Sequence, residues 1–107
     1  MQENLIILGG GESGVGAALL GKKQGFRVFL SDRGSLKEEY RSKLIANGIE
    51  FEERTHSEDR ILNADLVVKS PGISKKAPLI QELIARHIPI ISEIEFASRY
   101  TTAKIIA

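Results

Sequence analysis

The chain has 107 residues, 42% of them hydrophobic, and a formal net charge of +1 at pH 7. This length fits a single domain with its own hydrophobic core, and the mixed charges lack the basic stripe typical of nucleic-acid-binding surfaces. The absence of cysteine excludes disulfide bonds and thiolate metal sites.

The histidines and the apolar runs argue against a metal site and a membrane protein. His56 and His87 stand alone, without the spacing of metal ligands, and we interpret both as ordinary surface or helix-end residues. No apolar run approaches the roughly 20 residues that span a bilayer. Residues 1–4 lead directly into an apolar strand without a signal-peptide pattern. We therefore expect a soluble, cytoplasmic protein with no nucleic-acid or membrane partner.

The first predicted unit is a strand over residues 4–8, a glycine-rich turn, and a helix from Ser13 to about Gln24 that is closed by Gly25. The glycines at 9, 11 and 14 have G-x-G-x-x-G spacing. The first permits a tight turn, the second lets the backbone approach a phosphate, and the third lets the helix pack on the strand. The helix N-terminus then faces an anion, because its first N–H groups are unpaired. A glycine turn that serves only packing is the alternative.

A second buried strand over residues 28–31 ends at Asp32, about 20 residues beyond the glycine turn. An acid at this place fits a nucleotide site. Ser35 and Glu38 have the spacing of a capping box, which predicts a helix that ends near residues 47–48.

The rest of the chain continues the alternation of strands and helices. We expect an edge strand over 49–52, a helical turn over 57–62, a buried strand over 66–69, a Ser-Pro-Gly turn at 70–72, a helix from Pro78 to about His87, a strand over 88–91, and a helix from a Ser92–Glu95 capping box to about Tyr100. Residues 104–107 begin another apolar run, which predicts that the sequence is a fragment of a larger protein.

These elements predict an α/β fold: a Rossmann-like, doubly wound, five-stranded parallel sheet in a single domain. Near-continuous apolar strands and right-handed crossovers favour a sheet that is covered on both faces, with strand order 3-2-1-4-5. We expect this domain over residues 1–102, with residues 103–107 starting a strand that leads into a further domain. The loops 9–14, 32–33 and 70–72 then converge at the topological switch point.

Three segments resemble the Mur ligases, the amide-forming ligases of peptidoglycan synthesis, and most closely the N-terminal domain of those that add D-glutamate. The segments are residues 6–14, 64–73 and 89–96, of which the strand followed by Ser-Pro-Gly-Ile is the most specific. The resemblance implies a domain that binds the UDP part of UDP-N-acetylmuramoyl-L-alanine. It also implies that Lys104-Ile105-Ile106-Ala107 leads into central ATP-binding and C-terminal domains of the same chain. ATP and Mg²⁺ are then cofactors of the full-length enzyme, and this fragment has none.

The same resemblance assigns roles to residues in the three converging loops. Backbone N–H groups of Glu12 and Ser13 would contact the diphosphate, although Glu12 stands where the family more often has an apolar residue. Asp32 would accept hydrogen bonds from the uracil or the ribose. The predicted UDP-binding residues are Gly9, Gly11, Glu12, Ser13, Gly14, Asp32, Arg33, Ser70, Pro71 and Gly72. Asp32 as a cap of the turn that follows it, and residues 70–72 as a plain turn, remain alternatives.

Two other functions fit part of this pattern. An NAD- or FAD-binding domain of an oxidoreductase or regulatory sensor fits the glycine turn and Asp32, because an acid there pairs with ribose hydroxyls. The Ser-Pro-Gly-Ile segment counts against it. The other is an α/β domain without a ligand. Because no G-x-x-x-x-G-K-[ST] loop occurs in the 107 residues, we expect this chain alone to lack ligase activity.

Overall fold

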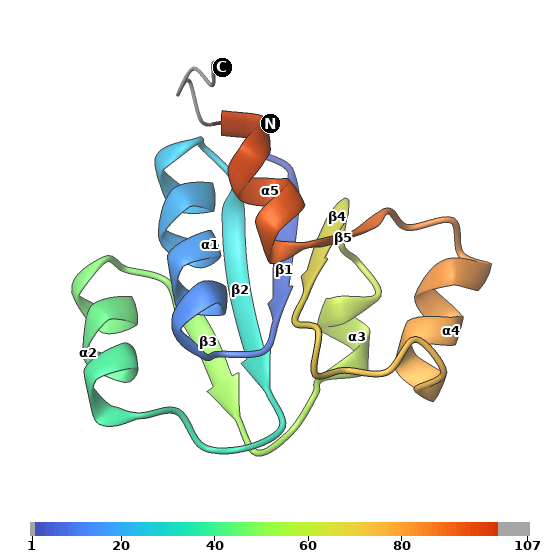
Figure 1. Ribbon diagram of the computed structural model, residues 1–107, viewed down its shortest axis with the longest axis horizontal. Helices are drawn as coiled ribbons and strands as arrows, with labels where there is room; N and C mark the ends of the chain where they lie inside the picture. Colours follow the sequence, from blue (N-terminus) through green and yellow to red (C-terminus); the bar gives the residue numbers. More distant parts are fainter. Residues whose placement is uncertain (1, 101–107) are drawn as a thin grey trace.

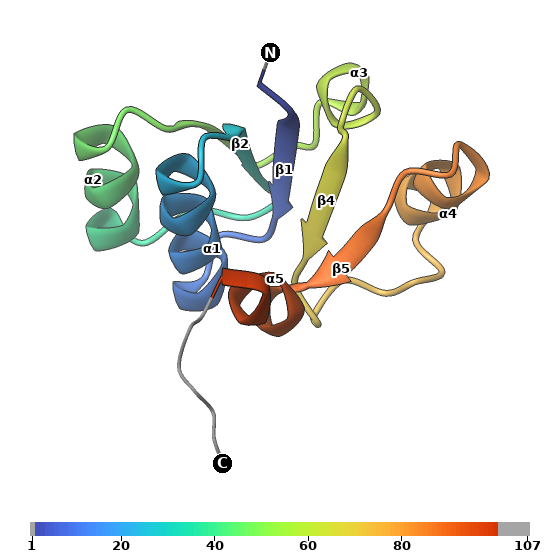
Figure 2. The same ribbon diagram turned by 90° about the horizontal axis from the view of Figure 1, so that it is seen from above.

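The computed structural model describes residues 2–100 and contains a five-stranded parallel sheet with helices on both faces (Figures 1 and 2). The strands are β1 (Asn4–Leu8), β2 (Arg27–Asp32), β3 (Glu50–Glu53), β4 (Leu66–Lys69) and β5 (Ile90–Ser92). The helices are α1 (Glu12–Lys23), α2 (Glu38–Ala46), α3 (Glu58–Ile61), α4 (Pro78–Ala85) and α5 (Glu93–Tyr100). The predicted domain boundary at residue 102 and the predicted strand at 104–107 lie outside the described residues.

The strands are ordered β3-β2-β1-β4-β5, and each neighbouring pair is parallel. This arrangement confirms the predicted doubly wound sheet and its strand order. In the centre, Ile6 of β1 lies between Phe29 of β2 and Val67 of β4. The chain turns toward β2 after β1 and crosses to β4 only after β3, so the topological switch point lies between β1 and β4.

Two hydrophobic cores, one on each face of the sheet, explain why successive residues in the middle of the inner strands are apolar. Successive side chains of a strand point to opposite faces. Leu5 and Ile7 of β1 belong to the core that includes residues of α1, α2 and α5, with Phe96 of α5 fully buried. Ile6 and Leu8 belong to the core beneath α3 and α4. Figure 2 shows these two groups of helices on opposite sides of the sheet.

The predicted capping box at Ser35 and Glu38 is wrong. Helix α2 begins at Glu38 with Lys37 as its N-cap, and none of the described side chains caps it. Tertiary contacts hold the preceding residues in place instead: the Leu36 side chain is buried, and its backbone N–H donates to Glu53 Oε1 at 2.8 Å.

The capping interaction predicted at the start of α5 is present, because Ser92 Oγ accepts a hydrogen bond from the Glu95 N–H at 3.0 Å. Other boundaries differ from the prediction by one or two residues: α4 ends at Ala85, and β5 begins at Ile90. Exposed His87 follows α4 with φ of 60°, which agrees with its interpretation as a helix-end residue. Within residues 2–100, no helix is both long enough and apolar enough to cross a membrane.

Gly14 lets α1 pack closely against the end of β1. A Cβ atom at Gly14 would lie 1.9 Å from the carbonyl oxygen of Gly9 and 3.0 Å from its carbonyl carbon. Since those atoms belong to the backbone, they cannot move aside as a flexible side chain would. This is the contact that the third glycine of the motif was predicted to serve.

We predict that Gly14→Ala lowers the free energy of unfolding by about 1–3 kcal/mol, the usual range for overpacking. Gly16→Ala is the matched control, because it lies on the same helix and a Cβ there meets no atom within 4 Å in the part of the chain that the structure describes. That control should be up to about 1 kcal/mol more stable than wild type, because alanine favours helices. Urea unfolding of both variants measures the difference; a Gly14→Ala variant as stable as wild type would contradict this packing.

Candidate functional site

The ends of the three inner strands are joined by backbone hydrogen bonds at the switch point. The Gly9 N–H donates to the Ser31 carbonyl at 2.9 Å, which ties the end of β1 to β2. The Ser70 N–H donates to the Leu8 carbonyl at 3.0 Å, which ties the end of β1 to the turn after β4. The loops 9–14, 32–33 and 70–72 therefore meet at one edge of the sheet, as predicted.

The first two glycines of the motif have different surroundings. Gly9 has a φ of +109°, and a Cβ there would lie 2.7 Å from Ser70 Cβ, so the turn requires both the freedom and the small size of glycine. At Gly11, an added Cβ would meet none of the atoms of residues 2–100 within 4 Å. Gly11 therefore leaves open space directly in front of α1.

The N-terminus of α1 faces this open space. Gly11 is the N-cap, and no side chain in the described part of the chain caps the helix. Glu12 and Ser13 are both exposed in the first turn. The first backbone N–H groups of an uncapped helix, together with its dipole, form a ready-made site for an anion.

Asp32, at the end of β2, connects two loops of the site through both of its carboxylate oxygens. Asp32 Oδ2 accepts a hydrogen bond from the Gly10 N–H at 2.6 Å, and Oδ1 accepts one from the Gly34 N–H at 2.7 Å. The second contact is the turn cap that the sequence left open as an alternative. Since each oxygen can accept more than one hydrogen bond, these contacts leave acceptor capacity for a ligand.

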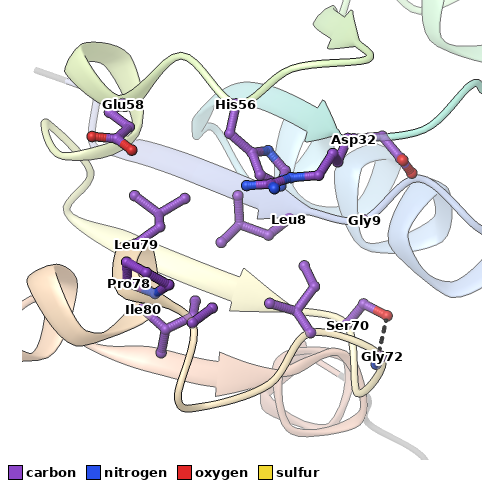
Figure 3. A pocket seen from close by; sticks show the side chains of 13 residues that line it. Leu8, Gly9, Asp32, His56, Glu58, Ser70, Gly72, Pro78, Leu79 and Ile80 are labelled. Carbon is purple, nitrogen blue, oxygen red and sulfur yellow. Dashed lines mark hydrogen bonds between the residues drawn. The ribbon is translucent and has the colours of Figure 1, made fainter.

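A cavity of about 510 Å³ opens beside the switch point and extends under the first turn of α4 (Figure 3). Its polar lining comes from the ends of several parallel strands, and its apolar lining comes mainly from β1 and α4. The lining residues are Leu8, Gly9, Asp32, Arg33, His56, Glu58, Ser70, Gly72, Ile73, Ala77, Pro78, Leu79 and Ile80. The mixture of an apolar wall and a few convergent polar groups is typical of small-molecule sites.

The turn after β4 is ordered by its own hydrogen bonds. Ser70 Oγ accepts from the Gly72 N–H at 3.3 Å, and the Ile73 N–H donates to the Ser70 carbonyl at 3.1 Å. The ammonium group of Lys69 donates to the carbonyl oxygens of Ser70 and Ile73, at 3.1 Å and 2.7 Å. This turn therefore presents a fixed backbone to the cavity that Ser70 and Gly72 line, and Figure 3 shows the hydrogen bond between these two residues.

A second cavity, of about 660 Å³, begins on the other side of this turn and runs along β5 and α5. Ser13 and Pro71 line it, together with Lys69 and Glu93. Burial raises the pKa of Glu93, and the charge of Lys69 opposes this rise.

The two cavities divide the residues that were predicted to bind UDP. The first cavity is lined by Gly9, Asp32, Arg33, Ser70 and Gly72, and the second by Ser13 and Pro71. Neither cavity is lined by Gly11, Glu12 or Gly14.

The interpretation of His56 as an ordinary surface or helix-end residue is wrong. Its side chain is half-buried, lines the first cavity, and lies with Nδ1 2.6 Å from Ser31 Oγ. Burial lowers the pKa of His56, the positive charge of Arg33 lowers it further, and the carboxylates of Glu52 and Asp32 oppose both effects. A sequence signal existed, because His56 follows the carboxyl end of a parallel strand, where such sheets place their ligands.

Glu58, at the start of α3, is another cavity residue that the sequence analysis missed.

The structure shows no candidate metal site in the part of the chain that it describes. Within residues 2–100, no group of three or more histidine, aspartate or glutamate side chains is arranged to hold a metal ion.

The sheet order and the crevice between β1 and β4 define a Rossmann-like α/β domain. The chain belongs to the MurD N-terminal domain family, whose sequence pattern matches residues 5–79. This membership does not favour the alternative of an NAD- or FAD-binding domain.

Similar proteins are known from several organisms. The UDP-N-acetylmuramoylalanine–D-glutamate ligase of Bacteroides fragilis is 54% identical over 104 residues, which are 97% of this chain and 23% of that protein. The ligase of the same name from Christiangramia forsetii is 49% identical over 106 residues, covering 99% of this chain and 24% of that protein. The chain thus spans about a quarter of the length of these curated relatives.

A murein peptide ligase from Psychrobacter arcticus has a similar solved structure, with a TM-score of 0.82 at 23% sequence identity. The likeness covers 92% of this chain and 21% of that one. At 23% identity, this likeness supports the fold alone.

Asp32→Ala should lower the free energy of unfolding by about 1–3 kcal/mol, because it leaves the Gly10 and Gly34 N–H groups without their acceptor. Asp59→Ala, a change at an exposed acid of α3, is the control and should stay within about 0.5 kcal/mol of wild type. Thermal or urea unfolding measures both variants. Equal stability of Asp32→Ala and wild type would show that these two hydrogen bonds do not hold the loops.

Proposed function

We propose that this chain is the UDP-binding N-terminal domain of an ATP-dependent ligase that adds D-glutamate to UDP-N-acetylmuramoyl-L-alanine in peptidoglycan synthesis. The observation that carries the proposal is the open, uncapped start of α1 beside a cavity at the switch point. The names of the relatives, which are D-glutamate ligases, support the choice of substrate.

In this proposal, the diphosphate of UDP lies at the start of α1 and accepts hydrogen bonds from the backbone N–H groups of Glu12 and Ser13. Gly11 leaves room for its approach. Glu12 is exposed, so its carboxylate can turn to solvent and avoid the repulsion that a negative charge next to the diphosphate would cause.

The uridine lies in the cavity of about 510 Å³. Asp32 accepts a hydrogen bond from the uracil or the ribose, Arg33 adds positive charge, and the turn Ser70–Gly72 flanks the uridine. The sugar extends past Ser13 and Pro71 toward the second cavity, which begins on the other side of the same turn.

ATP and Mg²⁺ belong to the rest of the full-length enzyme. This chain has no loop of the P-loop type, and its described residues offer no cluster of metal-binding groups. The partners of this domain are accordingly the nucleotide substrate and the central ATP-binding and C-terminal domains of the same polypeptide. We place the enzyme in the cytoplasm, and we expect this chain alone to be inactive as a ligase.

An NMR titration of the ¹⁵N-labelled chain with UDP and, separately, with NADH tests the proposal. We predict that UDP binds more tightly, with modest affinity, and that it shifts the amide signals of residues 9–14, 32–33 and 70–72. Tighter binding of NADH would contradict the assignment of the ligand. UDP binding that leaves residues 9–14 unshifted would contradict the position of the diphosphate.

Gly11→Val provides a variant for the same titration. Because Gly11 has φ of −76° and ψ of −171°, a valine fits its backbone conformation without strain, and the fold should be retained. Its side chain fills the open space in front of α1 and should abolish UDP binding. Gly16→Val is the matched control, since Gly16 is also exposed and a Cβ there meets none of the described residues within 4 Å. UDP affinity that survives in folded Gly11→Val would show that the glycine turn serves packing only.

A further inference from the structure

A hydrogen-bonded cluster lies directly behind the cavity. Ser31 of β2, which is fully buried, lies opposite Glu52 in the β2–β3 register. Its Oγ is 2.7 Å from Glu52 Oε2, 3.1 Å from the Thr55 carbonyl oxygen and 2.6 Å from His56 Nδ1. A single hydroxyl group therefore has three close polar neighbours.

The donors and acceptors around Ser31 Oγ determine where the hydroxyl proton of Ser31 and the ring proton of His56 lie. A hydroxyl carries one proton, and both the carboxylate and the carbonyl can only accept. If the Ser31 proton pointed at His56 Nδ1, the lone pairs of Ser31 would face Glu52 Oε2 at 2.7 Å with no proton between them. The favourable arrangement has Ser31 donating to the charged carboxylate and His56 Nδ1–H donating to Ser31 Oγ.

The ionisation of Glu52 agrees with this arrangement. Burial by itself raises the pKa of Glu52, but hydrogen bonds from Ser57 and Ser31 outweigh that effect, and the pKa is lowered. Ser57 donates to this carboxylate twice, from its N–H at 2.7 Å and from its Oγ at 2.5 Å. Glu52 is therefore an anion at neutral pH and a strong acceptor for Ser31.

The imidazole of His56 is neutral under the same conditions, because burial and the nearby charge of Arg33 lower its pKa. The other charged groups near it are Glu52 and Asp32, with Glu58 on the same cavity wall. A neutral imidazole has one nitrogen that donates and one that accepts. With the proton on Nδ1, the accepting nitrogen is Nε2.

The free edge of the ring is the one that carries Nε2. Nδ1 is turned toward buried Ser31, whereas the side chain as a whole lines the cavity, as Figure 3 shows. Among the described residues, no fully buried side-chain nitrogen or oxygen lacks a hydrogen-bond partner, and no protein partner of Nε2 is present. This nitrogen therefore keeps exposed surface, and the side chain that carries it lines the cavity.

We infer that His56 is a specificity-determining residue: held by Ser31 in its Nδ1–H tautomer, it presents Nε2 as an acceptor for a hydrogen-bond donor of the bound nucleoside. This inference rests on the proposed function and extends that function by naming the residue that selects for such a donor. A uridine offers two kinds of donor, the imide N–H of the base and the hydroxyl groups of the ribose. A ligand group that only accepts would face Nε2 with a lone pair and be disfavoured.

The tautomer can be measured without a ligand. Long-range ¹H–¹⁵N correlation spectra of the wild-type chain at pH 7 distinguish a protonated Nδ1 from a protonated Nε2. We predict a protonated Nδ1 for His56 and the opposite, or a mixture, for exposed His87 as the internal comparison. A protonated Nε2 in His56 would overturn the inference, whatever the chain binds.

Two substitutions of His56 distinguish the role of Nδ1 from the role of Nε2. In His56→Asn, the amide can still donate to Ser31 from the place of Nδ1, but nothing replaces Nε2. In His56→Gln, the longer side chain can place its carbonyl oxygen near the position of Nε2. We predict that His56→Asn weakens UDP binding by about three- to tenfold, the range expected for one lost hydrogen bond, and that His56→Gln weakens it less.

Two analogues identify the donor. N3-methyl-UDP lacks the imide N–H, and 2′-deoxy-UDP lacks a ribose hydroxyl. Wild type should prefer UDP to one of these analogues, and that preference should disappear in His56→Asn, which shows whether the base or the ribose meets Nε2. Preferences that are the same in wild type and in folded His56→Asn for both analogues would overturn the inference. Absence of UDP binding by the wild-type chain would instead overturn the proposed function, and with it the role of His56 toward this ligand.

Discussion

The structure depends on the close packing of backbone around Gly9. At this residue, the end of β1 meets the start of α1 on one side and the turn after β4 on the other. A side chain at Gly14 would collide with the Gly9 carbonyl, and a side chain at Gly9 would collide with Ser70. Because these contacts are between backbones or very small groups, they fix the relative positions of α1, β1 and the Ser-Pro-Gly turn, and with them the crevice.

Asp32 adds an electrostatic constraint to this steric one. Its two carboxylate oxygens accept hydrogen bonds from Gly10 in the glycine turn and from Gly34 after β2. A carboxylate held in this way keeps a fixed orientation before any ligand arrives, which lowers the entropy lost on binding. The same residue therefore has a structural role that the structure shows and a ligand role that we propose, and its substitution should affect both.

The sequence was sufficient to predict the elements, the strand order and the convergence of three loops, because these follow from local patterns. Apolar runs such as Leu5–Leu8 define buried strands, and glycine spacing defines the first turn. Two predictions failed where a tertiary contact decides the outcome. Ser35 does not cap α2, because Leu36 is buried and bonded to Glu53. The sequence shows that His56 follows the end of a strand, but the contact of His56 with Ser31 depends on the pairing of β2 with β3, which no local pattern around His56 reveals.

The central claim is that the start of α1 and the adjacent cavity form one continuous site for UDP. A crystal structure of the chain with UDP tests this claim most directly. We predict diphosphate oxygens within hydrogen-bond distance of the backbone N–H groups of Glu12 and Ser13, and the uridine in the cavity between Asp32, His56 and Ser70. A UDP molecule bound elsewhere on the domain, or a diphosphate that does not contact the start of α1, would contradict the account.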